Sequence, residues 1–310
     1  MQEQRPKSGF TSTQTLLFMV GLSFVCAFIL SILASVLAKP QELAKELDRS
    51  KQMMIAAHIL DHAGFFHVEE KEGKSVIAKV TPEGILIADP QAKPATNAQI
   101  FEMYKKRFQP LLVDDKGDVH TFPEMKVNEE EYMTQYKKQG YYKVPLRLIY
   151  AILPDMQSST ETDKAAENMP IGYVIPINGF GLWDAVYGYL AIKPDGNSVI
   201  GTSWYDQKET PGLGANISEA PWQDLFPGKK IFQESPGGTT DFKTAPLGIT
   251  VVKGKVIDVL GDTPKAKSAV DGMAGATLTG NGVTDAYRDV LAAYRPFLMK
   301  LAHKSSDKGE

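Results

Sequence analysis

The sequence is poor in the side chains that most often build disulfides and metal sites. Its 310 residues include a single cysteine, Cys26, and five histidines. One cysteine forms no internal disulfide, and it cannot build a cysteine-rich metal or iron–sulfur site. An excess of one charge is also absent, since 34 basic residues stand against 37 acidic ones with no basic block or stripe. The electrostatic footprint of a nucleic-acid-binding protein is therefore missing, and we expect no nucleic-acid partner.

Patterns for catalysis by side chains alone are missing as well. No serine stands in a nucleophile-elbow pattern, and the five histidines lie outside the glycine-rich segments. No Gly-x-Gly run continues at the spacing of a dinucleotide-binding loop. We therefore expect no catalytic residue and no metal site in this chain, and demanding chemistry would have to come from a cofactor.

One long apolar segment lies close to the N-terminus. No charged residue occurs from Ser8 to Ala38, and the densest apolar run spans Leu16–Leu37. Its length is about the 20 residues that a helix needs to cross a bilayer. We therefore expect an N-terminal tail over residues 1–14 and a single-pass transmembrane helix over residues 15–38. A cleaved signal peptide is the alternative, but its apolar core usually runs only about 7–15 residues.

The charges beside this segment give a weak indication of its orientation. Lysine and arginine near a membrane span are retained on the cytoplasmic side. Fewer of them precede the apolar run than follow it: Arg5 and Lys7 before, and Lys39, Lys45, Arg49 and Lys51 after. By this count alone, the domain that follows would lie in the cytoplasm.

We expect residues 39–154 to form a membrane-proximal helix and an N-terminal lobe. Apolar residues at helical spacing predict the helix over residues 41–62, after a break at Pro40. His58 and His62 would lie one turn apart on it, either as candidate metal ligands or as ordinary surface or packing residues. Local patterns then predict a hairpin of 76–80 with 85–88, loops and short helices over 93–142, and a strand over 146–153.

Residues 155–310 are expected to form the second domain, beginning with a polar linker or surface loop at 155–167. Turn signals predict a strand at 173–177 and two hairpins, 185–193 with 198–204 and 249–252 with 256–260. From Val283 onward, apolar residues recur every three or four positions, which predicts a C-terminal helix. The expected fold class is α+β, with a mainly antiparallel sheet and a C-terminal helix after one transmembrane helix.

A glycine-rich run, DGMAGATLTGNGV, spans residues 271–283 and leads into the C-terminal helix. A helix N-terminus offers free backbone N–H groups and partial positive charge, and both suit a phosphate. Small residues such as Gly272 and Gly275 would let a bulky ligand approach the backbone closely. The same composition also fits a plain helix start, with Thr279 or Asn281 as the N-cap.

Two further segments are rich in glycine: GFGLWDAVYGYLAIKPDGN over residues 179–197 and ETPGLG over residues 209–214. The glycines of the first fit bends or a bulge in a strand, and Trp183 fits a core aromatic residue. In the second, Thr-Pro-Gly is typical of a turn with Gly212 at a positive φ, which would present backbone N–H groups outward.

The run from Asp271 to Thr277 resembles the flavinylation motif of covalent FMN-binding domains, where an Asp precedes a Ser/Thr-Gly-Ala-Thr-like tetrad. The resemblance implies that Thr277 receives FMN through a phosphodiester bond, formed by a flavin transferase that uses FAD. It also implies that Gly275 and Ala276 shape the loop and that Asp271 belongs to the sequence the transferase reads. Ala274 stands where Ser or Thr is usual, so modification would be slower if that hydroxyl assists recognition.

Taken with the two other glycine-rich segments, this motif resembles the C subunits of the Na⁺-translocating NADH:quinone oxidoreductases. The N-terminal anchor, the helix after it and the overall length match that family too, and the match is weakest over about residues 90–145. The resemblance implies that the flavin site is lined by residues of these two segments: Leu182, Trp183, Thr210, Pro211, Gly212 and Leu213.

The resemblance further implies a location and partners. The chain would be a non-catalytic subunit of the translocase, anchored in the bacterial inner membrane with its soluble domain in the periplasm, against the weak charge count. Its FMN would take single electrons from an iron–sulfur centre in neighbouring membrane subunits and pass them to another covalent FMN, towards quinone. Two alternatives stay open: an FMN-carrying subunit of a ferredoxin-linked complex, and a non-redox binding protein of the envelope.

Overall fold

The computed structural model describes residues 11–69, 74–155, 169–238 and 240–306. The chain divides into two compact units, Met1–Asp48 and Arg49–Glu310. The polar stretch expected at 155–167 lies, apart from its first residue, outside the described residues.

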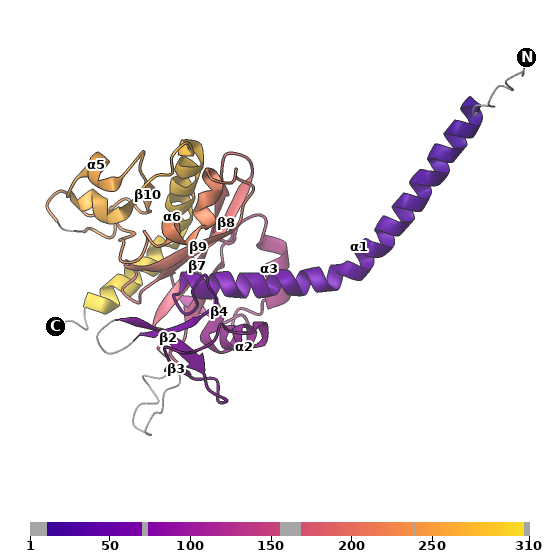
Figure 1. Ribbon diagram of the computed structural model, residues 1–310. Helices are drawn as coiled ribbons and strands as arrows, with labels where there is room; N and C mark the ends of the chain where they lie inside the picture. The colour runs from indigo at the N-terminus through magenta and orange to yellow at the C-terminus, as the bar shows by residue number, and fades with distance from the viewer. Residues whose placement is uncertain (1–10, 70–73, 156–168, 239, 307–310) are drawn as a thin grey trace, which may run out of the picture. The chain divides into compact units, whose positions relative to one another are not determined.

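The first unit contains most of α1, an α-helix over Ser12–Ala56 (Figure 1). Among the described residues, α1 is the one helix long and apolar enough to cross a membrane. The helix continues through Pro40, so the break predicted there is wrong. Proline removes one N–H donor and crowds the preceding turn, but the good helix formers on both sides keep this helix continuous.

The C-terminal end of α1 is also earlier than predicted. The helix ends at Ala56, so both His58 and His62 lie beyond it. His58 has a φ of 56°, in the left-handed region. The amide of Ile59 donates to the carbonyl of Met54 at 2.9 Å, which is the hydrogen-bond pattern of a Schellman-type helix end. A left-handed residue at this point turns the chain away from the helix axis, which periodicity does not reveal.

The second unit is built around a six-stranded sheet of order β5-β4-β6-β7-β8-β9, in which every neighbouring pair is antiparallel. Its strands are β4 (Phe108–Val113), β5 (Val119–His120), β6 (Arg147–Ile152), β7 (Gly172–Phe180), β8 (Ala185–Ile192) and β9 (Val199–Asp206). β6 and β7 confirm the strands predicted there, and β8 and β9 confirm the predicted hairpin. Because β6 pairs with β7, one sheet extends across the domain boundary expected near residue 155.

Two strands of this sheet lie where loops and short helices were expected, over residues 93–142. The short helices α2 (Asn97–Arg107) and α3 (Glu129–Tyr136) are present, but β4 and β5 lie between them. β4 contains a proline, Pro110, which cannot donate a hydrogen bond to a neighbouring strand. It is tolerated because β5 pairs only with the end of β4, so the backbone at Pro110 has a strand partner on the β6 side alone.

The other strands that the structure describes form two small sheets. β1 (Phe66–Glu69), β2 (Ser75–Val80) and β3 (Leu86–Ala88) pair antiparallel in that order, which confirms the first predicted hairpin. β10 (Thr250–Val251) pairs in parallel with β11 (Ala269–Val270). Within the described ranges, the remaining short helical segments are α4 (Ala220–Gln223), α5 (Val256–Leu260) and three 3₁₀ turns at Tyr141–Lys143, Gly214–Ser218 and Pro264–Ser268.

The hairpin predicted for 249–252 with 256–260 is wrong. Its second half is the helix α5, and its first half pairs with β11 instead. The carboxylate of Asp271 accepts a hydrogen bond from the Val256 amide at 2.7 Å, which satisfies a free donor at the start of α5. This contact joins residues far apart in the sequence, so a local pattern of apolar residues does not disclose it.

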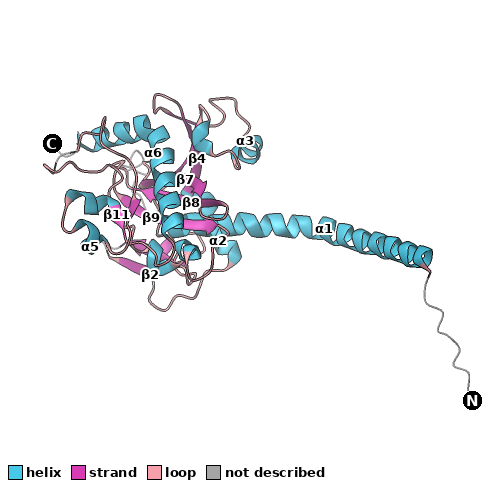
Figure 2. Ribbon diagram, turned by 90° about the horizontal axis from the view of Figure 1, so that it is seen from above, coloured by secondary structure: helices cyan, strands magenta, loops and turns pink. Residues whose placement is uncertain are grey.

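The long helix α6 (Thr277–Ser306) packs on β7 and supplies a large part of the core (Figures 1 and 2). Its predicted apolar face is buried as expected: Val283, Ala286, Tyr287, Val290, Leu291, Tyr294 and Leu298. The Tyr287 hydroxyl lies 2.7 Å from the Thr202 hydroxyl and accepts from the Trp204 indole at 3.1 Å. The predicted α+β class is confirmed, with a mainly antiparallel sheet and a C-terminal helix.

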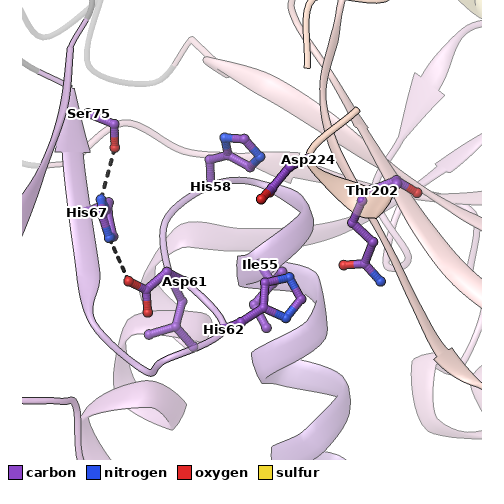
Figure 3. Close-up of a pocket in the computed structure, with 10 residues that line it drawn as sticks. Ile55, His58, Asp61, His62, His67, Ser75, Thr202 and Asp224 are labelled. Atoms are coloured by element: carbon purple, nitrogen blue, oxygen red, sulfur yellow. Dashed lines mark hydrogen bonds and ion pairs between the residues drawn. The ribbon is translucent and has the colours of Figure 1, made fainter. Parts of the chain in front are cut away.

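A cavity of about 190 Å³ adjoins the end of α1 (Figure 3). His58 and His62 line it, together with His67, whose Nε2 lies 3.0 Å from the Asp61 carboxylate and whose Nδ1 lies 3.1 Å from the Ser75 hydroxyl. Within the described ranges, no group of three or more His, Cys, Asp or Glu side chains is placed to hold a metal ion. The pair His58 and His62 therefore gains no third ligand there.

His58 makes the stability of this region depend on pH. Burial lowers its pKa below the ordinary value of 6.5, Asp224 opposes this shift, and His67 and His62 add to it. The unfolded chain then binds this proton more readily, so the stabilisation is complete above about pH 6.5 and is lost as pH falls below it. We predict that His58→Asn, which tolerates the left-handed backbone, removes this part of the slope.

Denaturant unfolding at about pH 7.5 and about pH 5.5 measures this effect. One such group contributes at most about 1.4 kcal/mol per pH unit to the free energy of unfolding. Equal pH slopes in the wild type and in His58→Asn would contradict the prediction.

Candidate functional site

Thr277 is the first residue of α6, and its side chain is exposed. The helix begins before Val283, where the apolar periodicity starts, so Thr279 and Asn281 lie inside it and neither is the N-cap. The first amides of a helix have no partner within it, and the helix dipole adds partial positive charge at the same end. An anionic group attached to Thr277 would therefore lie in a favourable field.

A cavity of about 280 Å³ lies beside Thr277. It is formed by residues 251–255, the loop 272–277 and the first turn of α6. Ligand pockets in proteins commonly measure about 300–1,000 Å³, so this cavity suits a small group or one part of a larger ligand. Lys253 and Lys255 belong to its wall, which adds positive charge beside Thr277.

Two glycines of the loop are required by its shape. A Cβ atom on Gly272 would lie 2.0 Å from the carbonyl oxygen of Val252, which is far inside contact distance. Gly275 has a φ of 73°, a conformation that other residues seldom adopt. The loop thus follows its path only because these side chains are absent, and Thr277 is presented at its end.

Asp271 fixes the beginning of this loop. Its carboxylate accepts from the Val256 amide, and its backbone carbonyl accepts from the Trp222 indole at 3.0 Å. The side chain is half-buried. Asp271 is therefore held by hydrogen bonds from two other segments of the protein.

Trp183 lies just beyond the end of β7 and is 68% exposed, so it is not a core aromatic residue. Its indole N–H donates to the Thr210 hydroxyl at 3.2 Å. Leu182 beside it is 49% exposed. The first glycine-rich segment therefore presents a large flat side chain and an apolar neighbour at the surface.

The ETPGLG segment forms the turn that its sequence predicts. The Leu213 amide donates to the Thr210 carbonyl at 3.1 Å, and Gly212 has a φ of 75°. Pro211 and Leu213 are exposed. A Cβ atom on Gly275 would lie 2.9 Å from the Leu213 side chain, so this turn touches the loop that precedes Thr277.

Glu209 is a site residue that sequence reasoning missed. It is only 5% exposed, and its carboxylate accepts from the Trp183 amide at 3.0 Å and from the Thr279 hydroxyl. It thereby links both glycine-rich segments to the first turn of α6. The only signal in the sequence was a glutamate at the head of the ETPGLG segment, and glutamates usually lie in solvent.

The glycines of these segments allow the same close approach. A Cβ atom on Gly181 would lie 2.4 Å from the Glu209 carboxylate, and one on Gly214 would lie 2.5 Å from the Thr279 hydroxyl. On the helix side, a Cβ atom on Gly282 would lie 1.9 Å from the Phe180 carbonyl oxygen. Three segments far apart in the sequence therefore meet at one site because their Cβ atoms are absent.

The sequence-predicted residues thus come together: Asp271, Gly275, Ala276, Thr277, Leu182, Trp183, Thr210, Pro211, Gly212 and Leu213 lie on three segments in mutual contact. At the start of α6, free backbone amides and partial positive charge would favour a phosphoryl group carried by the Thr277 hydroxyl. Exposed indole and leucine side chains beside it suit a planar aromatic ring. Fold and site together define a domain of the flavin mononucleotide-binding class.

Comparison with known proteins agrees with this class. The family described as FMN-binding domain matches residues 181–292. Solved structures of the C subunit of the Na⁺-translocating NADH-quinone reductase from Parabacteroides distasonis and of NqrC from Shewanella oneidensis share the fold. The first has a TM-score of 0.52 at 21% identity, covering 84% of this chain and 96% of that one. The second has a TM-score of 0.51 at 22% identity, covering 83% and 99%.

Curated relatives narrow the assignment. The C subunit of the Na⁺-translocating NADH-quinone reductase of Chlamydia caviae is 40% identical over an alignment of 309 positions, which covers 97% of this chain and 97% of that one. The corresponding subunit of Chlamydia pneumoniae is 42% identical over 299 residues, 94% of this chain and 92% of that one. The chain belongs to the NqrC family, the C subunits of the Na⁺-translocating NADH-quinone reductases, which confirms the family indicated by the sequence motifs.

Removing the Asp271 side chain should destabilise the folded loop. Asp271→Ala leaves the Val256 amide without its acceptor, and we expect the free energy of unfolding to fall by about 1–3 kcal/mol. Asp271→Asn keeps an oxygen acceptor and should cost less. Asp262→Ala, at an exposed position nearby, serves as the control and should change stability by about 0.5 kcal/mol or less. An Asp271→Ala protein as stable as this control would contradict the role given to the carboxylate.

Proposed function

We propose that this protein is the electron-carrying C subunit of a Na⁺-pumping NADH:quinone oxidoreductase and holds FMN covalently on Thr277. The single observation that supports this most is the position of Thr277. Its exposed hydroxyl lies at the start of α6, beside a cavity and near two segments with exposed apolar side chains. The chain also belongs to the NqrC family. When bound, FMN supplies one-electron transfer between an iron–sulfur centre and a second flavin in neighbouring subunits.

The covalent bond would form by transfer of a phosphoryl group. The Thr277 oxygen attacks the FMN-side phosphorus of FAD on a flavin transferase. An oxygen–phosphorus bond forms, the P–O–P bridge breaks, AMP leaves, and the hydroxyl proton is released. No electrons change hands in this step. Exposure of Thr277 at the first residue of α6 supports access by a separate enzyme.

The residues around Thr277 would hold the phosphoryl group. The first amides of α6 and the positive end of its dipole favour the negative charge. Lys253 and Lys255 on the cavity wall add to this attraction. Gly275 and Ala276 shape the loop, and the close contact of Gly275 with Leu213 keeps the phosphate side of the site next to the ETPGLG turn.

The isoalloxazine ring would lie against Leu182, Trp183, Thr210, Pro211, Gly212 and Leu213. The exposed apolar groups of Leu182, Trp183 and Leu213 would exclude water from the ring on binding. The turn at Gly212 offers backbone groups for hydrogen bonds to its polar edge. Burial and hydrogen bonding of this kind tune the potential of a flavin.

The apolar part of α1 would anchor the protein in the bacterial inner membrane, with the second unit in the periplasm. A covalent link suits that side, because a flavin lost there has no local pool to replace it. Relatives that match more than nine-tenths of this chain carry the name of the Na⁺-translocating enzyme. This favours the sodium-pumping complex over a ferredoxin-linked complex and over a non-redox envelope protein.

Replacement of the acceptor hydroxyl tests the covalent link. We predict that full-length protein from its own membrane, denatured and separated on a gel, shows flavin fluorescence, and that Thr277→Val shows none. Valine keeps the volume of threonine and removes only the nucleophilic oxygen. Thr263→Val, at another exposed threonine, should retain full fluorescence. A dark wild-type band in the presence of the transferase would overturn the proposal.

The residues assigned to the ring should influence its potential. Trp183→Ala exposes the ring to water, which favours the more charged reduced state and should raise the midpoint potential by tens of millivolts. A change of about 59 mV in a one-electron couple corresponds to a tenfold change in the equilibrium. Thr210→Ala removes the partner of the Trp183 indole and should also shift the potential. Spectroelectrochemical titration, with Ile87→Ala as a distant exposed control, measures both; no shift in either variant would contradict these contacts.

A further inference from the structure

Glu209 is nearly completely buried, and its carboxylate lies behind the proposed flavin site. One of its oxygens accepts from the Trp183 backbone amide, and the other accepts from the Thr279 hydroxyl. In the part of the chain that the structure describes, no lysine or arginine forms an ion pair with it. A buried carboxylate is costly without compensation, and here two donors and the nearby start of α6 supply it.

The two donors belong to opposite sides of the site. Trp183 provides the ring-facing side chain of the first segment, and Thr279 lies two residues after the proposed FMN acceptor in the same helical turn. Glu209 itself immediately precedes Thr210, whose hydroxyl accepts from the Trp183 indole. One carboxylate therefore connects the segment proposed to hold the ring with the helical turn that carries the proposed attachment point.

Two neighbouring glycines leave the space that the end of the Glu209 side chain occupies. A Cβ atom on Gly181 would lie 2.4 Å from one Glu209 oxygen, and a Cβ atom on Gly214 would lie 2.7 Å from the other. Both glycines leave room for the carboxylate to reach its donors. A side chain one methylene shorter would not reach both donors from the same backbone.

We propose that Glu209 is a positioning residue for the flavin. It holds the Trp183 segment and the first turn of α6 at the separation that fits the ring to Trp183 while the phosphate remains on Thr277. This inference rests on the proposed function. It adds a residue that touches neither the phosphate nor the acceptor oxygen, yet on which attachment of the flavin and its potential both depend.

Three substitutions separate hydrogen-bond geometry from simple stability. Glu209→Gln keeps the length: its carbonyl oxygen can accept from the Trp183 amide, and its amide can donate to the Thr279 oxygen. Glu209→Asp keeps the charge but loses one methylene, and Glu209→Ala loses both contacts. Glu219→Ala, at an exposed glutamate ten positions further along the chain, is the matched control.

The experiment uses the full-length chain, produced in membranes together with the flavin transferase. Covalent flavin per protein is measured by in-gel fluorescence at short times of transferase action, and the midpoint potential of the flavin is measured by spectroelectrochemistry. Losing one buried hydrogen bond is worth about 1.4 kcal/mol, or roughly tenfold in rate or equilibrium. We therefore expect flavin attachment to slow roughly tenfold in Glu209→Asp and further in Glu209→Ala, while Glu209→Gln restores it to within about twofold.

The midpoint potential of the flavin that does attach should also change, because the Trp183 segment is displaced. In Glu209→Asp we expect a midpoint potential shifted in the same direction as in Trp183→Ala. We also expect thermal unfolding to show that this variant is folded. A folded Glu209→Asp protein with the attachment rate and potential of Glu219→Ala would overturn the inference. Attachment in Glu209→Gln as slow as in Glu209→Ala would also overturn it. A wild type without covalent flavin would instead refute the proposed function itself, since Glu209 then has no flavin to position.

Discussion

The packing of α6 against the six-stranded sheet is the constraint on which the site depends. The Tyr287 hydroxyl forms hydrogen bonds with Thr202 and Trp204 of β9. The Tyr294 hydroxyl donates to the Leu148 carbonyl of β6 at 2.7 Å. Rotation or sliding of α6 would leave these buried groups unpaired, at about 1–3 kcal/mol each. Because the helix is held in this way, its first residue, Thr277, has one position, and the loop before it must end there.

Close approach of backbones then assembles the rest of the site. Gly181, Gly214 and Gly282 lie where the three functional segments come nearest to one another, and a Cβ atom at any of them would lie within 2.5 Å of another segment. Alanine at any of these positions would force the segments apart, because its Cβ atom would overlap atoms of the neighbouring segment. The glycine content of the motifs therefore has a structural cause in addition to any contact with a ligand, which explains why the motifs occur together.

The charges of the site are arranged so that its negative groups are already satisfied. The Glu209 carboxylate accepts hydrogen bonds from the Trp183 amide and the Thr279 hydroxyl. The Asp271 carboxylate accepts one from the Val256 amide at the start of α5. The free positive potential near Thr277 comes from the α6 terminus and from Lys253 and Lys255, and it is available to an anion. An FMN phosphoryl group would thus meet attraction from the helix end without direct competition from these two carboxylates for the same donors.

Local patterns were sufficient for the elements that bury one face or turn sharply. The apolar run of α1, the hairpin of β8 and β9 and the buried stripe of α6 are each set by neighbouring residues. The motif around Thr277, together with the two other glycine-rich segments, indicated the family. Local patterns failed where a distant partner decides. β4 is a strand because β6 pairs with it despite Pro110, α5 is a helix because Asp271 caps it, and α1 stops where His58 turns left-handed. The burial of Glu209 and the exposure of Trp183 likewise follow from which segments meet, because a side chain's solvent access and hydrogen-bond partners are properties of the packed chain and not of its neighbours in sequence.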